Sequence, residues 1–204
     1  MITMITKTTK LISLVSVISV PLVSLFIYND YTTGQAPTTS QSAQVKSVWQ
    51  RFSSQEGKFS VLFPGTPRLS QQKMTSDNGE LQVNLFTVNR PQEEAKYTVA
   101  YIDYPAQYIQ LLRSRNLVEQ AIEQGKSTAL QRVRGTIVSE EKKTLGDNVG
   151  MEVDYTTPDG KVVKQRIFLV DNRFYQITAE TTQKRQRFLT RSMQGFCDSF
   201  KLLP

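Results

Sequence analysis

The chain has 204 residues, of which 39% are hydrophobic and 21% charged, the usage of an ordinary globular protein rather than a disordered tract. It holds no histidine and a single cysteine, Cys197, which excludes histidine-dependent triads, zinc sites built on histidine or cysteine, and any intramolecular disulfide. With no such ligand set and only a mild basic excess, a net charge of +7, we expect no metal, no cofactor and no nucleic-acid partner.

The first predicted element is an apolar segment at residues 11–28, which carries no charge over its 18 positions. Lys7 and Lys10 precede it and only Asp30 follows closely, so the positive-inside rule places the N-terminus in the cytoplasm. We predict that residues 1–28 form a signal anchor that contacts the membrane through residues 11–28; a cleaved signal peptide stays open as the alternative. Either outcome places the domain on the periplasmic or thylakoid lumen side, and cleavage would make it secreted.

A polar segment at residues 29–47, rich in Thr, Ser and Gln and without apolar periodicity, follows the leader. This composition is typical of a flexible tether. Residues 48–204 then form one domain, which is long enough to bury a core of its own and which we expect to be a monomer.

Three strands are predicted in the first part of the domain. Residues 59–63 alternate between apolar and polar positions and stop at the Pro-Gly-Thr-Pro sequence of residues 64–67. Residues 81–88 form the second strand, after an Asn-Gly turn at residues 76–79. Residues 97–104 are apolar at nearly every position, which predicts a strand covered on both faces.

A helix is predicted next, with a short helical turn at residues 108–115 leading into it. Asn116 and Glu119 have the spacing of a capping box, and Gly135 is expected to take the left-handed conformation that closes the helix. One apolar face is predicted from Val118, Ile122, Gly125, Ala129 and Val133.

Four more strands follow, at residues 137–143, 150–156, 162–170 and 174–180, separated by short Gly-Asp, Asp-Gly and Asp-Asn turns. Strands joined by such short turns must be antiparallel. A last amphipathic helix begins near Thr182, with an apolar stripe at Leu189, Met193, Phe196 and Phe200. The order predicts an α+β fold, an antiparallel sheet flanked by helices.

Two short sequences match catalytic motifs, but the predicted structure around each of them does not fit the motif. Ser70 and Lys73 match the S-x-x-K pattern of penicillin-recognising enzymes, but no helical pattern surrounds Ser70, which we place in a turn between strands. Residues 125–127 resemble the end of a phosphate-binding loop but fall inside the predicted helix. Cys197 is interpreted as a buried apolar residue, because no histidine exists to activate it. We therefore assign no catalytic, cofactor-binding or metal residue and expect no enzymatic activity.

Basic residues gather on the first helix end, the last hairpins and the final helix. Two interpretations stay open: a solvated face, or a docking surface for an acidic partner or an anionic lipid face. The candidate docking residues are Arg132, Arg134, Lys161, Lys164, Arg166, Arg173, Lys184, Arg185, Arg187 and Arg191.

Four segments, at residues 52–67, 150–155, 166–177 and 196–202, resemble a bacterial, exported or membrane-anchored branch of the PsbP/Mog1-like fold family. The resemblance implies an α/β/α sandwich around an antiparallel sheet. It also implies a role in binding macromolecules or membranes rather than in catalysis, possible association with a photosystem included. The histidine metal ligands known in the family have no counterpart in this chain.

The leading hypothesis is therefore a non-enzymatic, membrane-tethered binding or assembly module that docks on a protein or membrane complex with an acidic surface. The alternative is a carrier of a small ligand or lipid in the periplasm or lumen, with a cleft between the sheet and the helix at residues 116–134. The abundance of Tyr and Phe on the strands motivates that alternative.

Overall fold

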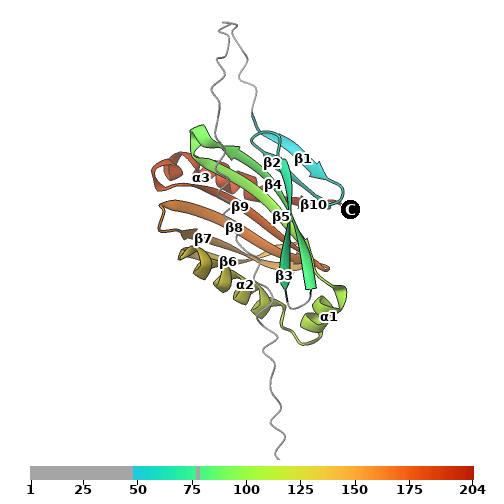
Figure 1. Cartoon of the computed structure of the whole chain (residues 1–204). Coiled ribbons are helices and arrows are strands. Elements are labelled where there is room, and N and C mark those ends of the chain that lie inside the picture. The colour runs from blue at the N-terminus through green and yellow to red at the C-terminus, as the bar shows by residue number, and fades with distance from the viewer. Residues whose placement is uncertain (1–47, 77–78) are drawn as a thin grey trace, which may run out of the picture.

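The computed structural model describes residues 48–76 and 79–204 (Figure 1). The predicted signal anchor at residues 1–28 and the predicted tether at residues 29–47 lie outside the described residues. Among the described residues, no helix combines the length and the apolar character needed to cross a membrane.

Seven antiparallel strands form the main sheet, in the order β3-β4-β5-β9-β8-β7-β6 (Figure 1). Their bounds are β3 Arg68–Ser76, β4 Gly79–Arg90, β5 Ala95–Asp103, β6 Thr136–Leu145, β7 Asn148–Thr156, β8 Lys161–Val170 and β9 Arg173–Thr182. The predicted meander of the last four is confirmed, because β6 pairs with β7, β7 with β8 and β8 with β9. In its turns Gly146, Gly160 and Asp171 take positive φ angles, as the turn sequences indicate. β9 also pairs with β5, which joins the two halves of the chain at the centre of the sheet.

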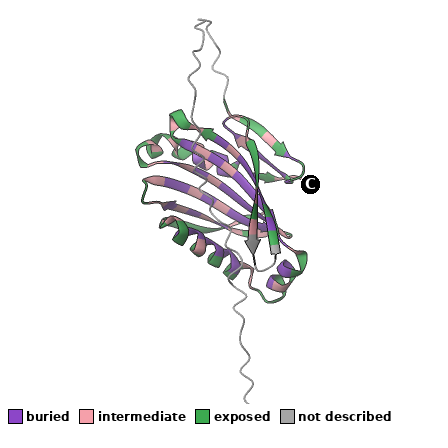
Figure 2. Ribbon diagram, in the orientation of Figure 1, coloured by how far each residue is buried: buried purple, intermediate pink, exposed green. Residues whose placement is uncertain are grey.

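The central strands are buried on both faces along part of their length. In β5 the side chains of Tyr97, Val99 and Tyr101 pack on one face and those of Ala100 and Ile102 on the other, and all five are at most 6% exposed. Figure 2 shows the resulting run of buried and half-buried positions along the middle of the sheet. The prediction of a strand covered on both faces is confirmed.

A second, three-stranded sheet is made of β1 Gln50–Ser54, β2 Phe59–Phe63 and β10 Lys201–Leu202. The sequence predicted a single sheet that included residues 59–63, and the structure corrects this: β2 is the middle strand of the small sheet. β1 and β3 were missed because their mostly polar, exposed residues give no apolar alternation. Ser70, expected in a turn, therefore lies within β3.

Helices cover both faces of the main sheet. Helices α1 Ala106–Ser114 and α2 Val118–Val133 pack on one face, where Leu112 and Ile122 join one apolar core. Helix α3 Gln183–Asp198 and the small sheet pack on the other, where Phe196 and Phe63 join a second core. A 3-10 turn, Pro91–Glu93, links β4 to β5. The predicted α+β architecture with helices on both sides of an antiparallel sheet is confirmed.

Helix α2 leaves part of its face of the sheet uncovered. Its C-terminal half packs through Leu130 on Val153, Tyr155 and Val163 of β7 and β8. Figure 1 shows the facing parts of β5 and β9 beyond the reach of α1 and α2. The predicted start of α2 is wrong, since Leu117 is the N-cap residue and makes no side-chain capping bond. Asn116 instead takes a left-handed conformation, with a φ of 55°, in the link between the two helices.

Candidate functional site

The uncovered area of the main sheet is hollowed into a cavity of about 430 Å³, which we call the sheet groove. Strands β4, β5, β7, β8 and β9 and the C-terminal end of α2 line it. Apolar side chains form much of its floor, from Val83, Leu85, Ala100 and Val163. Small-molecule pockets have volumes of about 300–1,000 Å³, so the sheet groove has the size of a ligand site.

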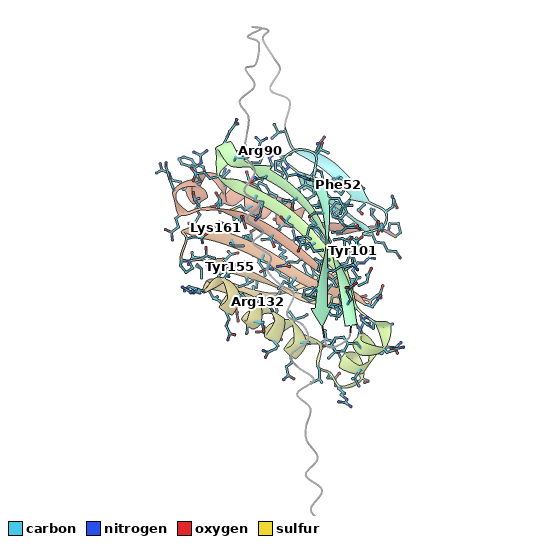
Figure 3. All side chains as sticks on the ribbon, viewed as in Figure 1. Phe52, Arg90, Tyr101, Arg132, Tyr155 and Lys161 are labelled. Carbon is cyan, nitrogen blue, oxygen red and sulfur yellow. The ribbon has the colours of Figure 1, made fainter. Side chains whose placement is uncertain are left out.

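Charged side chains of both signs surround the sheet groove. Lys96 Nζ lies 2.9 Å from Glu180 Oε1, and Lys161 Nζ lies 3.6 Å from that same oxygen and 3.7 Å from an Asp159 oxygen. Arg132 and Arg134 also line the groove, and neither forms an ion pair with another described residue. Figure 3 labels Arg132 with Tyr155 and Lys161, which line the same groove. Four cations against two carboxylates leave the lining with a net charge of +2.

Arg134 is held at the groove by an unusual backbone conformation. It is the C-cap of α2, with a φ of 51° and ψ of 41°, and its N–H donates to the carbonyls of Gln131 and Leu130. Gly135 was expected to take this left-handed conformation, and that prediction is wrong. Gly135 instead lies in a closely packed place, where a Cβ would lie 2.8 Å from Leu130 Cδ2 and 3.2 Å from Tyr155 Cδ2. A left-handed residue other than glycine costs about 1 kcal/mol.

Two buried amides belong to the same part of the sheet. Gln176 of β9 lines the groove and is 7% exposed. Gln165 of β8 is directly opposite Thr178, another lining residue, so its side chain lies on the groove face. Its Nε2 is buried without a hydrogen-bond partner among the described residues, an arrangement that costs about 1–3 kcal/mol. The groove therefore joins an apolar floor to polar and positively charged side chains.

A second feature lies on the other side of the main sheet. Lys184, Arg185, Arg187, Phe188 and Arg191 of helix α3 form a surface that we call the α3 face. Phe188 is 61% exposed, with the Arg187 guanidinium 4.5 Å and the Arg185 guanidinium 5.9 Å from its ring centroid. None of the four cations forms an ion pair with another residue in the described ranges, 48–76 and 79–204.

The charges of the α3 face are placed where they weaken the helix. The first turn of α3 holds no acidic residue, and its N-cap residue Thr182 makes no side-chain capping bond. Lys184 and Arg185 therefore add positive charge to the end of the helix that already carries the positive pole of the dipole, which is unfavourable by about 0.3–1 kcal/mol per charge. The result is a local excess of positive potential.

The ten candidate docking residues do not form one surface. Arg132, Arg134 and Lys161 line the sheet groove, and Lys184, Arg185, Arg187 and Arg191 belong to the α3 face. Lys164, Arg166 and Arg173 are each occupied by carboxylates of the same chain. The sequence could not separate these sets, because an ion pair depends on which strands become neighbours.

Glu152 of β7 is the centre of the occupied set. It lies 2.8 Å from Lys164 Nζ, and its other oxygen accepts from Arg166 Nε. Burial of Glu152 opposes ionisation, but hydrogen bonds from these two cations outweigh it and lower the pKa of the carboxyl. Arg166 also reaches Asp198 at the end of α3. This network fixes α3 to the sheet and holds no free charge for a partner.

Arg173 is bound equally firmly. Its Nε and Nη2 donate to the two carboxylate oxygens of Asp103 at 2.6 and 2.7 Å, and Nη1 donates to the Glu56 carbonyl. Its guanidinium also lies 4.4 Å from the ring centroid of Tyr101. The hydrogen bonds to Asp103 raise the pKa of the guanidinium above its usual range. Arg173 thus joins the two sheets rather than serving a docking surface.

The rejected catalytic motifs have structural roles. Ser70 is exposed on β3, and Lys73 pairs with Glu80 of β4 at 2.7 Å. The Gly-Lys-Ser sequence of residues 125–127 lies inside α2. Cys197 is 1% exposed, and burial raises the pKa of its thiol to about 12, so the thiol is protonated at neutral pH.

Sequence reasoning missed Phe188, Lys96 and the two buried amides. Phe188 precedes Leu189 and so falls off the apolar stripe of α3, between Arg187 and Arg191. A position between basic residues and off the apolar stripe does predict an exposed aromatic side chain. Nothing in the sequence marked Gln165 or Gln176, since a polar residue in a strand is ordinarily placed on its solvent face.

Comparisons with known proteins bear on the fold. No family model matches the sequence, and no curated protein matches it. Among solved structures the chain is similar to PsbP (CyanoP) from Synechocystis sp. PCC 6803, with a TM-score of 0.51, 12% identity, and coverage of 82% of this chain and 99% of that one. It is also similar to LpqN, involved in cell envelope biogenesis of Mycobacterium tuberculosis, with a TM-score of 0.38, 8% identity, and coverage of 68% and 86%. The predicted PsbP/Mog1-like fold is thereby confirmed, as a matter of architecture alone.

Proposed function

We propose that the chain is an exported, membrane-tethered module without enzymatic activity, which docks on an acidic surface of a protein or membrane complex through the α3 face. One observation carries the proposal: four cations that have no ion pair among the described residues surround a Phe188 that is 61% exposed. Arginine and aromatic side chains are enriched at protein interfaces, and the helix dipole adds to their positive potential.

The way the chain enters the domain supports this choice of surface. Trp49 packs edge-on against Tyr97, with 5.4 Å between ring centroids, and Tyr97 in turn contacts Phe196 of α3. The chain therefore joins the domain in the layer that contains the α3 face. A flexible tether over residues 29–47 would have a root-mean-square length of about 25 Å. The predicted anchor would thus keep the α3 face close to membrane complexes.

The surroundings of the candidate catalytic side chains support a role without catalysis. Ser70 lies exposed on a strand and Lys73 is engaged by Glu80, while the Cys197 thiol is buried and protonated at neutral pH. No group of three or more Cys, Asp or Glu side chains in residues 48–76 and 79–204 is placed to hold a metal ion. The proposed function is therefore docking through the α3 face.

Site-specific photocrosslinking in membranes tests the proposal. A photoreactive phenylalanine analogue at position 188 of the full chain is expected to form one discrete adduct with a partner protein. The same analogue at Val138, which is 67% exposed on β6, serves as the control and is expected to form none. Equal adducts from both positions would show that exposure alone explains them and would contradict docking through α3.

Charge reversal supplies the second arm. K184E/R187E/R191E is expected to abolish the position-188 adduct, because an acidic partner would then be repelled. The matched control K58E/R68E/R115E changes the same amount of charge at exposed residues outside α3 and is expected to keep the adduct. An adduct that survives the α3 reversal would overturn the proposal. Membrane extraction with N-terminal sequencing of the mature chain tests the anchor separately.

A further inference from the structure

We infer that the sheet groove is a binding site for an amphiphilic anion, a chain of methylene groups that ends in a carboxylate or a phosphate. This inference goes beyond docking through α3, because the groove lies on the opposite side of the main sheet. Docking through α3 and ligand binding in the groove can therefore be refuted independently of each other.

The floor of the groove suits an apolar chain. Val83 and Leu85 of β4, Ala100 of β5 and Val163 of β8 line it together, although they come from strands that are far apart in sequence. Alternate residues of a strand point to the same face, so these four side chains lie together on the groove face of the sheet. A groove of about 430 Å³ accommodates a short acyl or alkyl chain, and each methylene buried there contributes about 0.8 kcal/mol.

The charge of the groove selects an anionic end group. Lys96 and Lys161 share Glu180, and Lys161 also faces Asp159, so these four charges offset one another. The net charge of +2 therefore comes from Arg132 and Arg134, which have no ion pair with a described residue. A guanidinium group binds carboxylates and phosphates through paired hydrogen bonds.

A buried donor points to the same chemistry. The Gln165 Nε2 is buried without a hydrogen-bond partner in the described part of the chain, on β8 directly opposite Thr178 of β9, which lines the groove. Gln176 lines the groove directly and is nine-tenths buried. Buried amides that lack partners are uncommon in folded proteins, and oxygen acceptors of a bound ligand satisfy such donors. Gln176, which lines the groove, offers its amide to an oxygen of such a ligand, whereas a purely hydrocarbon ligand would make no hydrogen bond with it.

The backbone of Arg134 adds an independent argument. An arginine holds a left-handed conformation at the groove although glycine would adopt it without strain. Retention of a strained side chain fits a requirement for its charge at this position. The same fact provides a variant in which the cation is lost while the fold is relaxed rather than damaged.

The test uses the full chain in phosphatidylcholine nanodiscs and a ten-carbon fatty acid that carries a photoreactive diazirine. Saturable labelling is expected on the peptides that contain Val83, Ala100 and Tyr155, as mapped by mass spectrometry. Decanoate or decyl phosphate is expected to compete, and the stronger of the two identifies the end group. Decanol, which has only the chain, and inorganic phosphate, which has only the end group, are expected to compete at least tenfold more weakly. Labelling elsewhere, or equal competition by either fragment, would overturn the inference.

A matched pair of variants assigns the binding to Arg134. R134G is expected to raise the half-saturating concentration of the diazirine fatty acid by about fivefold to tenfold. The same variant is expected to raise the melting temperature. K58G removes the same charge and the same kind of strain, because Lys58 has a φ of 49° and is exposed outside the groove. It is expected to raise the melting temperature without changing the labelling. Wild-type labelling of R134G would refute the site, and neither variant touches the α3 face.

Discussion

At the scale of single residues, two glycines of this protein are under opposite constraints. Gly150 of β7 has no room for a side chain, because a Cβ would lie 2.2 Å from the Ile167 carbonyl oxygen and 2.3 Å from Phe168 Cδ1. Gly195 of α3 has no heavy atom within 4 Å of the position where a Cβ would stand, and it is exposed within a helix. Substituting Gly150 therefore tests side-chain packing, and substituting Gly195 tests helix propensity.

We predict that G150A and G195A change stability in opposite directions. G150A overpacks the β7–β8 pair and is expected to lower the free energy of unfolding by about 1–3 kcal/mol. G195A removes the conformational freedom of glycine from a helix and is expected to raise it by about 0.5–1 kcal/mol. Urea denaturation of both variants beside the wild type measures the two values. Changes of the same sign would show that the close approach at Gly150 does not limit the strand pair.

At the scale of elements, the ion network between β7, β8 and α3 predicts an acid-sensitive attachment. The pKa of Glu152 is lowered in the folded protein, since its hydrogen bonds from Lys164 and Arg166 outweigh its burial. E152Q is expected to lower the free energy of unfolding by about 1–3 kcal/mol at neutral pH. A lowered folded pKa stabilises above the unfolded value, about 4.3, and that contribution is lost as the pH falls through the folded pKa. The wild type and E152Q should therefore begin to converge as the pH falls below about 4.3, which urea denaturation across a pH series measures.

Glu141 provides the control for that prediction. It is directly opposite Glu152 on β6 and pairs at 2.9 Å with Lys143, but its side chain is 66% exposed. Exposed ion pairs contribute about 0–1 kcal/mol, and removal of a like charge opposite Glu152 offsets the loss. E141Q is expected to leave stability nearly unchanged at every pH. A loss as large as that of E152Q would show that burial of the network is not what matters.

The elements also show which parts of the fold the sequence could predict. Strand β7 has apolar alternation, and β8 and β9 are apolar runs bounded by turns such as Asp159-Gly160, so local chemistry alone specifies these strands. β1 and β3 have neither signal, and β10 has two residues, Lys201 and Leu202, whose strand pairing depends on β2, far away in the sequence. The ends of α2 were misassigned for a related reason. Gly135 is closely packed against Leu130 and Tyr155 rather than left-handed, and the left-handed conformation falls on Arg134 instead.

The candidate site was less predictable than the fold. The sequence proposed ten cations, and the structure distributes them between the sheet groove, the α3 face and internal ion pairs. The cleft expected beside residues 116–134 exists, but β4, β5 and β9 supply most of its floor, including Leu85 and Gln176. Such a surface depends on strand order, which local patterns do not contain. The likeness to PsbP has the same scope, since it reports the arrangement of elements and not their chemistry.

At the scale of the whole molecule, the two sheets share one aromatic core. Phe200, just before β10, stacks on Phe59 of β2 with 5.6 Å between ring centroids and meets Tyr175 of β9 edge-on at 5.4 Å. The Tyr175 hydroxyl also donates to the Gly57 carbonyl at 2.7 Å, within the turn between β1 and β2. The small sheet is therefore attached to the centre of the main sheet by buried contacts, and we expect both sheets to unfold as one cooperative unit.

Phe200→Ala tests this cooperativity. Loss of the buried ring is expected to lower the free energy of unfolding by about 3–5 kcal/mol. Native-state hydrogen exchange should then show the amides of β2 and of β9 losing protection by the same amount, because neither sheet keeps a complete core without the other. If the β2 amides alone lost protection, the small sheet would be a separately folding attachment. Helix α3, which packs on that same aromatic core through Phe196, would then have to keep its conformation without support from the small sheet.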